Sequence, residues 1–286
     1  MDQFNEYSTL KVIAIRNVEN AFVNTNRLEQ QWQALRFHSK PSFQDAMNEY
    51  ANLISLFESA GIKLNHLGGS EALTLDSIYT RDALIISPKG IILCRMGRSG
   101  RQSEPEINSR MLGLKIHGEI VAPGTLEGGD FIWLDKHNAA VGLGPRTNQS
   151  GIDQLKALLG PKVELHVVPL PAPDHPDDVF HLMSMISPLD SDLALIYRPL
   201  MPSAFLKWLK TLGLKFVEVA ESEFLDMACN VLAIGPRRII MLDKLPLTCK
   251  RLEDAGCEML LYKGDEISRK GEGGPTCLTR PLLREE

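Results

Sequence analysis

Long hydrophobic runs are absent from this 286-residue sequence, which contains no stretch long and apolar enough for a membrane-spanning helix. Such a helix needs about 20 predominantly apolar residues. The opening segment, MDQFNEYSTLKVIAIRN, also lacks the basic stretch and the long apolar stretch of a secretory signal. We therefore expect a cytoplasmic protein.

An excess of positive charge is lacking as well. The formal net charge is -5 and the isoelectric point is about 5.9. This balance disfavours a surface that neutralises phosphates or anionic lipids. We expect neither nucleic acid nor a membrane as partner, but a small molecule, and the sequence leaves open whether the chain forms a homodimer.

Paired cysteines are the third absence. The five cysteines are odd in number, widely spaced and form no CxxC pair, which argues against a structural zinc site. In a reducing compartment most of them should be small buried hydrophobic residues, with room for one reactive thiolate among them. They are Cys94, Cys229, Cys249, Cys257 and Cys277.

What the sequence does contain is a repeating order of elements: two apolar strands around a turn, an amphipathic helix, and another strand. In the first unit, strands within 83–95 flank the turn Pro88-Lys89-Gly90, followed by a helix near 103–113 and a strand near 118–122. Later units begin with FIWLDKHNAAVGL (131–143), HLMSMISPLDSDLALIYR (181–198) and ACNVLAIGPRRIIMLD (228–243). The predicted helices commonly end in glycine, which suits a left-handed C-cap, at Gly61, Gly160, Gly213 and Gly256.

A fifth unit would be divided between the two ends of the chain. Its strands would be TCLTRPLL (276–283), LKVIAIRN (10–17) and IKLNHLG (62–68), with a helix over 41–61. A repeat completed by both termini indicates a closed ring, because no end remains to be capped. We predict one α/β domain over 1–286, with functional loops meeting at the centre of the ring. An open doubly wound sheet is the alternative.

The segment Gly271-Glu-Gly-Gly-Pro-Thr-Cys277 is the first candidate for chemistry, because its glycines permit close backbone approach and a thiol sits where the loop enters a strand. A thiolate nucleophile would be favoured by nearby positive charge or by a cationic substrate. His181, at the start of an apolar stretch, is the best candidate for a general acid and base among the seven histidines. A buried structural role is the ordinary alternative for each.

Acidic residues supply the second group of candidates. Glu127 lies in LEGGD just before a strand, where charge is unusual and could bind a planar cation. Asp76 and Asp82 would lie on the same side of an extended strand. The alternative for Glu127 is a solvated acid in a hairpin turn, and the alternative for Asp76 and Asp82 is an exposed strand face. Arg101 and Arg146 follow glycine-rich turns and could hold a carboxylate in two hydrogen bonds.

The ordered motifs DSIYTRD, TLEGGD, VGLGPRTNQSGIDQL, HLMSMISPLD, CNVLAIG and GGPTCLTRP resemble those of the guanidino-group-modifying enzymes of the pentein fold. These include dimethylarginine dimethylaminohydrolase, arginine deiminase and the amidinotransferases. The resemblance spans most of the chain and implies a five-bladed ββαβ propeller with pseudo-five-fold symmetry. It implies no metal and no organic cofactor.

The resemblance also assigns roles to residues. Cys277 would attack the guanidinium carbon and form a covalent intermediate, and His181 would protonate the departing amine and then activate water. Glu127 and Asp82 would hold the guanidinium nitrogens. Asp76, Arg101 and Arg146 would bind the amino-acid end of the substrate, and Asn230 would be structural.

Two departures from the family patterns concern the substrate. Met183 stands where arginine deiminases commonly have an aspartate, as in the dimethylarginine enzymes. Arg81 stands where those enzymes tend to have an acid, as in the deiminases. Arg81 would pair with Asp76 or Glu127, or recognise a substrate carboxylate. The segment 24–41 is expected to contribute a lid.

These observations favour a hydrolase acting on a C–N bond of a linear amidine, either arginine or an N-substituted arginine such as dimethylarginine, giving citrulline or a similar ureido product. An amidinotransferase that passes the same group to an amine is the alternative. A non-catalytic pentein that binds a partner is a third, which the presence of a nucleophile, a base and two acids disfavours.

Overall fold

The computed structural model describes residues 4–172 and 180–286, which contain five three-stranded sheets. In each sheet the first two strands are antiparallel, and the third runs parallel to the second after a helical connection. Four sheets are continuous in sequence: β3-β4-β5 (Leu84–Ser87, Gly90–Leu93, Ile116–Glu119), β6-β7-β8 (Phe131–Trp133, Asn138–Leu143, Glu164–Pro169), β9-β10-β11 (Ile186–Asp190, Leu193–Ile196, Lys215–Glu218) and β12-β13-β14 (Leu232–Gly235, Arg238–Leu242, Glu258–Tyr262). Their connecting helices are α4 (Glu104–Leu112), α5 (Gln149–Leu159), α6 (Ser203–Thr211) and α7 (Pro246–Asp254).

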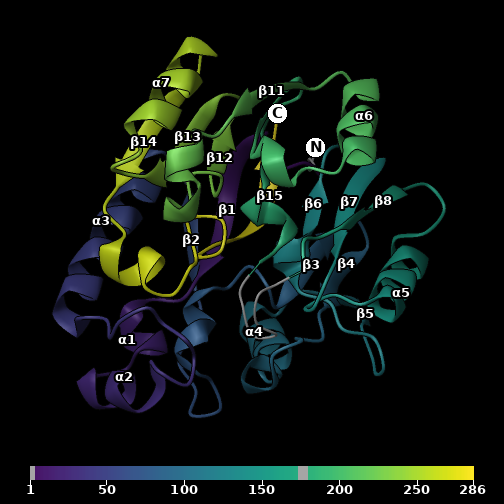
Figure 1. Cartoon of the computed structure of the whole chain (residues 1–286). Coiled ribbons are helices and arrows are strands. Elements are labelled where there is room, and N and C mark those ends of the chain that lie inside the picture. The colour runs from purple at the N-terminus through teal and green to yellow at the C-terminus, as the bar shows by residue number, and fades with distance from the viewer. Residues whose placement is uncertain (1–3, 173–179) are drawn as a thin grey trace.

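The fifth sheet is built from both ends of the chain, as predicted. Its strands are β15 (Arg280–Glu285), β1 (Thr9–Ile15) and β2 (Lys63–His66), and helix α3 (Phe43–Ser59) connects the last two. Thr9 pairs with Glu285 in the antiparallel ladder, so β1 and β15 run side by side (Figure 1). The predicted ββαβ order is therefore present in all five sheets.

Local sequence explains the turns of these units. At the β3–β4 hairpin the Ser87 hydroxyl donates to the Gly90 carbonyl at 2.7 Å. Gly90 has φ +132°, and a Cβ there would lie 2.3 Å from the Lys115 carbonyl oxygen, so only glycine fits. At the start of α5, the Asn148 side chain accepts a hydrogen bond from the Gly151 amide at 2.9 Å.

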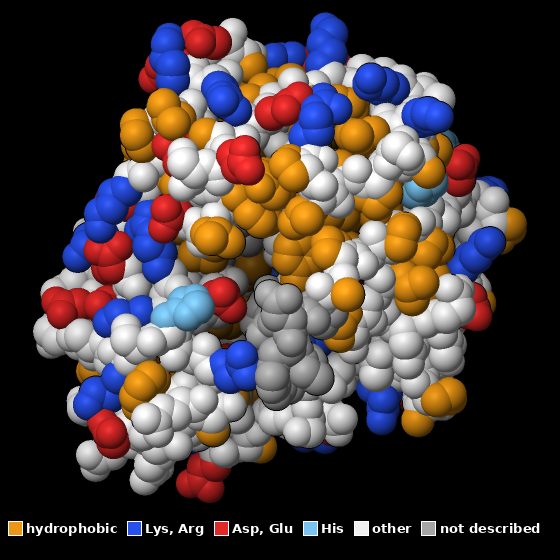
Figure 2. Space-filling view, in the orientation of Figure 1, with side chains coloured by type: hydrophobic (Ala, Val, Ile, Leu, Met, Phe, Trp, Pro, Cys, Tyr) orange, Lys and Arg blue, Asp and Glu red, His pale blue; other side chains and the backbone are white. Residues whose placement is uncertain are grey.

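The first strand of each sheet is largely buried, whereas the helices lie on the outside (Figure 1). In Figure 2, hydrophobic side chains gather near the middle of one face, and charged side chains of both signs surround them. That face therefore carries no extended surface of one charge. Across residues 4–172 and 180–286, none of the helices combines the length and apolarity needed to span a bilayer.

One local prediction about the segment before β3 was wrong. Residues Leu75–Ile78 form a 3-10 turn, so Asp76 and Asp82 do not share an extended strand. The turn is held by the buried Arg16 side chain, whose Nη1 donates to the Ser77 carbonyl at 2.8 Å. The strand expected near 118–122 is β5, two residues earlier.

His181 does not begin a strand, because a 3-10 turn over Leu182–Ser184 intervenes before β9. The segment 24–41 contains the short helix α2 (Thr25–Gln31). The C-terminal part of the segment 24–41 contacts the loop before β15, where the His38 amide donates to the Lys270 carbonyl at 2.8 Å. His38 Nε2 also lies 3.0 Å from Glu272 Oε1.

The glycines at helix ends have the positive φ that the sequence predicted, and this is testable at the end of α7. Gly256 has φ +81°, and a Cβ added there would have no other atom within 4 Å, so Gly256→Ala would add backbone strain without a clash. We expect Gly256→Ala to lower the free energy of unfolding by about 1 kcal/mol, measured by urea denaturation.

Gly235→Ala is the matched control for this substitution. Gly235 lies in β12 without positive φ, and its added Cβ would lie 3.9 Å from the nearest atom. It should lose less stability than Gly256→Ala. Equal losses in the two variants would contradict the conformational explanation.

Candidate active site

One chemically active side chain stands just before the first strand of each sheet. Five segments far apart in the sequence thus deliver a polar group at the same place in the repeated unit. The five residues are Asp82 before β3, Glu127 before β6, His181 before β9, Asn230 before β12 and Cys277 before β15. All five side chains are buried.

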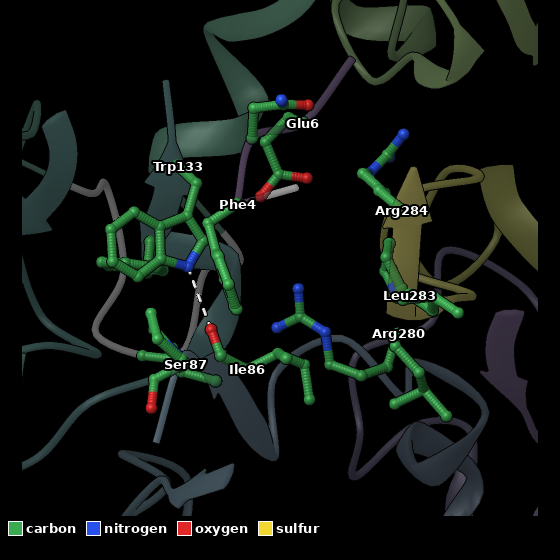
Figure 3. A pocket seen from close by; sticks show the side chains of 14 residues that line it. Phe4, Glu6, Ile86, Ser87, Trp133, Arg280, Leu283 and Arg284 are labelled. Atoms are coloured by element: carbon green, nitrogen blue, oxygen red, sulfur yellow. Dashed lines mark hydrogen bonds between the residues drawn. The ribbon is translucent and has the colours of Figure 1, made fainter. Parts of the chain in front are cut away.

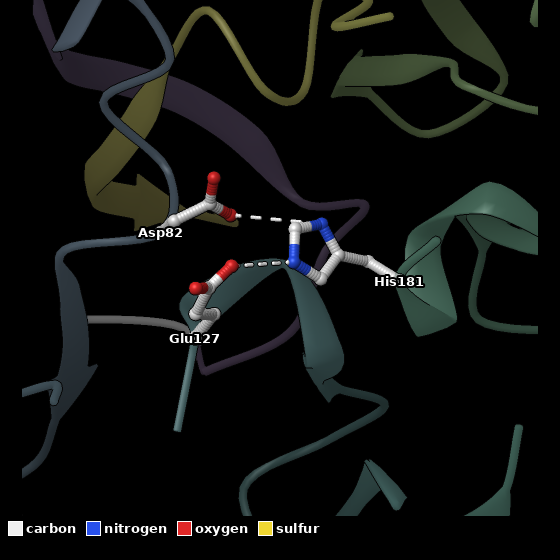
Figure 4. A group of neighbouring side chains, drawn as sticks. All are labelled: Asp82, Glu127 and His181. Carbon is white, nitrogen blue, oxygen red and sulfur yellow. Dashed lines mark hydrogen bonds and ion pairs between the residues drawn. The ribbon is translucent and has the colours of Figure 1, made fainter. Parts of the chain in front are cut away.

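The centre of this group is a buried ion pair between His181 and Glu127. His181 Nε2 lies 2.8 Å from Glu127 Oε2, and Nδ1 lies 4.0 Å from Asp82 Oδ1. Figure 4 shows the imidazole ring facing the two carboxylates. Burial disfavours the imidazolium, but the charges of Asp82, Asp130 and Glu127 outweigh it and raise the pKa of His181 to about 9.

The pKa of the partner carboxylate, Glu127, is shifted in the opposite direction. Burial would raise the pKa of Glu127, but the His181 hydrogen bond and charge, together with Arg146, lower it below its usual range. Arg146 Nη1 lies 3.3 Å from Glu127 Oε1. At neutral pH the site therefore contains an imidazolium paired with the ionised carboxylate of Glu127.

The short segment Gly128–Asp130 fixes the imidazole. Asp130 accepts hydrogen bonds from the Thr147 hydroxyl at 2.6 Å and from the Leu182 amide at 3.0 Å, which places the residue after His181. A Cβ on Gly129 would lie 2.7 Å from both Asp82 Oδ1 and His181 Nδ1. Glycine is therefore required for the two sheets to meet here.

Cys277 contacts the residue contributed by the neighbouring sheet. Asn230 Nδ2 donates to Cys277 Sγ at 3.1 Å, and Asn230 Oδ1 accepts from the Thr276 amide at 3.1 Å. Burial and the negative charge of Asp82 raise the pKa of Cys277 to about 11, although the hydrogen bonds from Asn230 and Thr276 oppose this. At neutral pH Cys277 is thus a thiol.

Asn230 was expected to be only structural, and the contact of Thr276 was not anticipated. A place for Asn230 in the site could have been predicted from the repeat, because Asn230 precedes the first strand of its unit as the other four side chains precede theirs. Gly274 supports the contact, since a Cβ there would lie 2.6 Å from the Asn230 carboxamide carbon.

Cys277, His181 and Asp82 face one small cavity of about 20 Å³. This is room for little more than water, which needs about 10–15 Å³. The cavity is also lined by Asp76, Tyr79, Arg98, Arg101, Arg146, Gly271, Glu272 and Gly273. An amino-acid substrate can enter only if side chains at the mouth move.

The arginines near the cavity are engaged in ion pairs. Arg101 binds Glu104 through Nε and Nη2, both at 2.8 Å, and Asp82 through Nη1 at 2.7 Å. Arg98 Nη1 lies 2.6 Å from Asp76 Oδ2. The buried pair positions Asp76 at the pocket.

Arg81 does not pair with Asp76 or Glu127. It is fully buried, and its Nη2 lies 2.8 Å from Glu6 Oε1. Asp82 lines the cavity, whereas Arg81 is not among its lining residues.

Asp82, Glu127 and His181 also form the one group among the described residues whose ligand atoms lie close enough to hold a metal ion, within 4.8 Å of one another. The mixed carboxylate and imidazole donors would suit a divalent cation. The same donors suit a guanidinium ion, which needs hydrogen-bond acceptors rather than coordination.

Known proteins resemble this chain in sequence and in fold. Residues 17–284 match the model of the family described as N,N dimethylarginine dimethylhydrolase, eukaryotic. A Streptomyces coelicolor N(G),N(G)-dimethylarginine dimethylaminohydrolase is 30% identical over 209 residues, covering 71% of this chain and 73% of the relative.

Two solved structures share the fold. An amidinotransferase of saxitoxin biosynthesis from Microseira wollei has a TM-score of 0.83 at 17% identity, covering 100% of this chain and 97% of the other. A dimethylarginine dimethylaminohydrolase from Pseudomonas aeruginosa, complexed with citrulline, has a TM-score of 0.77 at 22% identity, covering 97% and 100%. At such identities they establish the fold alone.

The state of the thiol gives a prediction. Alkylation of Cys277 by iodoacetamide in the substrate-free protein should be slow at pH 7 and rise about tenfold per pH unit toward pH 11, because the thiolate is the nucleophile. Asn230→Ala removes a donor to Sγ and should slow alkylation at a given pH. The measurement is mass spectrometry of the Cys277 peptide.

Asn65→Ala, on β2 and outside the pocket lining, is the control for this experiment. It should leave the alkylation rate unchanged. A pH-independent rate between pH 7 and 10 would contradict the protonated thiol.

The ion pair gives a second prediction, for stability. The pKa of His181 is about 9 in the folded protein, above the ~6.5 of an unperturbed histidine. Its contribution to the free energy of unfolding should be complete below pH 6.5 and lost as pH rises through 9. Urea denaturation of wild type and His181→Gln should therefore show a difference that shrinks by about 3 kcal/mol between pH 6 and pH 9.5. A difference that grows with pH would refute this assignment.

Proposed function

The chain belongs to the eukaryotic N,N dimethylarginine dimethylhydrolase family, and from this premise we propose that it hydrolyses a C–N bond of arginine or an N-substituted arginine through a covalent Cys277 intermediate. The observation that carries the proposal is the pocket shared by Cys277, His181 and Asp82, with Glu127 bound to His181 from outside the pocket lining. A nucleophile, a proton carrier and one carboxylate thus face the same cavity, and the second carboxylate acts on it through His181.

Substrate binding supplies the missing activation. A guanidinium ion placed against Asp82 and Glu127 exchanges its hydration for carboxylate hydrogen bonds. Its positive charge beside Cys277 offsets the burial and the Asp82 charge that raise the pKa of the thiol. The thiol then releases its proton to solvent water, because His181 is already protonated, so that the reactive thiolate forms mainly when a substrate is present.

Bond making and proton transfer balance over two steps. The thiolate forms a C–S bond to the guanidinium carbon, and the C–N bond to the leaving amine breaks as that nitrogen takes the proton of the His181 imidazolium. Water then attacks the thiouronium carbon while His181 accepts its proton. Breaking of the C–S bond releases a ureido product, which is citrulline when the substrate is an arginine derivative, and the second proton of the water returns the sulfur to its resting thiol.

Asp76, Arg101 and Arg146 take different parts in this proposal. Arg101 and Arg146 are positioning residues, because they already bind Asp82 and Glu127. Asp76, held by Arg98 at the cavity wall, is available for the amino group of the substrate. Arg81 belongs to the interior rather than to substrate recognition.

We further propose that the five sheets close into a ring, one domain over 1–286. A hydrogen bond links the first-strand regions at each of the five junctions. These bonds are Trp133 Nε1 to Ile86 O, Leu182 N to Asp130 Oδ1, Ser187 Oγ to Cys229 O, Arg284 Nη1 to Ala233 O, and Arg280 Nη1 to Leu84 O.

The test is product analysis with purified protein and arginine, monomethylarginine or dimethylarginine. Citrulline and the released amine should form, and the amine released fastest identifies the substrate. Cys277→Ser should lower the rate by about 1000-fold or more, because it removes the nucleophile. Citrulline formation that persists in Cys277→Ser would refute the mechanism.

Cys249→Ser is the matched control, because Cys249 lies in α7, away from the pocket lining, and should retain activity. An amine acceptor added to the assay distinguishes the transferase alternative. Formation of an amidino-acceptor product at the expense of citrulline would favour transfer over hydrolysis.

A further inference from the structure

A second cavity of about 130 Å³ lies along the first strands themselves, whereas the active-site groups precede those strands. It is lined by residues of β3, β6 and β15 and by the segment that contains Phe4 and Glu6. Figure 3 shows the Arg280 guanidinium reaching into the middle of this group, near Phe4 and Glu6. Its volume exceeds several times the ~10–15 Å³ that one water needs.

Positive charge exceeds negative charge around this cavity. Arg280 and Arg284 line it and are each only 4% exposed, and the fully buried Arg81 lies beside them. Glu6 is the one carboxylate that lines it, and it is bound to Arg81 at 2.8 Å. Among the described residues, two of the three guanidinium ions therefore lack a carboxylate partner.

The hydrogen bonds of the two lining arginines are incomplete. Arg280 Nη1 donates to the Leu84 carbonyl at 2.6 Å, and Arg284 Nη1 donates to the Ser8 and Ala233 carbonyls at 2.6 and 2.9 Å. Arg280 Nε and Arg284 Nε and Nη2 are buried and have no partner within the described part of the chain. Buried donors are rarely left unsatisfied in folded proteins.

A buried guanidinium without a counter-ion is strongly unfavourable, because arginine cannot readily discharge by losing its proton. Burial, with the charge of Arg81, lowers the pKa of Arg280 to about 9, and burial lowers that of Arg284 to about 10. An anion in the cavity would relieve both the charge imbalance and the missing acceptors.

We propose that this cavity binds a small oxyanion, such as phosphate or a short carboxylate, between Arg280 and Arg284. Guanidinium groups recognise oxyanions through paired, charge-assisted hydrogen bonds. The site is separate from the proposed catalytic function and does not depend on it. It is coupled to the nucleophile through β15, which begins three residues after Cys277, and through the Arg81 amide, which donates to the Cys277 carbonyl at 3.2 Å.

The consequence is stabilisation by oxyanions. Thermal unfolding of the full chain in phosphate, compared with chloride at equal ionic strength and pH, should show a rise of the midpoint by roughly 5 °C at about 100 times the dissociation constant. Arg284→Gln should abolish most of this rise. Arg238→Gln, an exposed arginine of β13, is the matched control and should retain it.

Crystals of the wild-type protein grown with selenate keep the test independent of whether Arg284→Gln folds. An anomalous peak between Arg280 and Arg284 is expected. Its absence, or a phosphate effect that survives Arg284→Gln and is lost in Arg98→Gln at the active site, would overturn the proposal. Citrulline formation, measured in parallel, reports separately on the proposed function.

Discussion

The buried ion pair between His181 and Glu127 is the interaction on which the rest of the site depends. At 2.8 Å, it fixes the imidazole between two carboxylates and keeps it charged at neutral pH. Three neighbouring residues, Asp130, Arg146 and Gly129, hold the ion pair in place. Asp130 places the backbone after His181, Arg146 lies against Glu127, and the absence of a side chain at Gly129 lets the groups meet. The imidazolium and its carboxylate partner are therefore paired in the protein without any ligand.

Charge is distributed along the first strands in a way that separates two environments. Before the strands, the carboxylates of Asp76 and Asp82 line the same small cavity as the Cys277 thiol. Along the strands, Arg280 and Arg284 face a second cavity in which positive charge dominates. Arg81 lies between the two, with its amide bonded to the Cys277 carbonyl and its guanidinium on Glu6. The two environments lie side by side because the adjacent residues take different partners: Asp82 lines the small cavity, whereas the Arg81 guanidinium lies against Glu6.

Much of the fold could be predicted from the sequence because it repeats. Turn residues and changes in hydrophobic period located all five ββαβ units, including the one shared by the termini. The loop positions of Cys277, His181 and Glu127 followed from glycines and charges placed directly before apolar strands. The resemblance to a known family added their roles.

What could not be predicted depends on contacts between distant segments. The 3-10 turn at Asp76 is held by a hydrogen bond from Arg16, the residue that directly follows β1. The partner of Arg81 is Glu6, a residue 75 positions earlier that no local pattern connects to it. The contact of Asn230 with Cys277 Sγ joins two sheets and becomes visible only when they pack together.

The central claim is that the substrate cation, held by the carboxylates, converts Cys277 into the nucleophile that carries the reaction. The most direct measurement is intact-protein mass spectrometry after acid quenching during turnover, followed by location of the modified residue. Arginine, monomethylarginine and asymmetric dimethylarginine should all give an adduct of the same mass on Cys277, because the amine by which they differ has already left. An adduct that retains the methyl groups, or one that forms on another residue, would contradict the account.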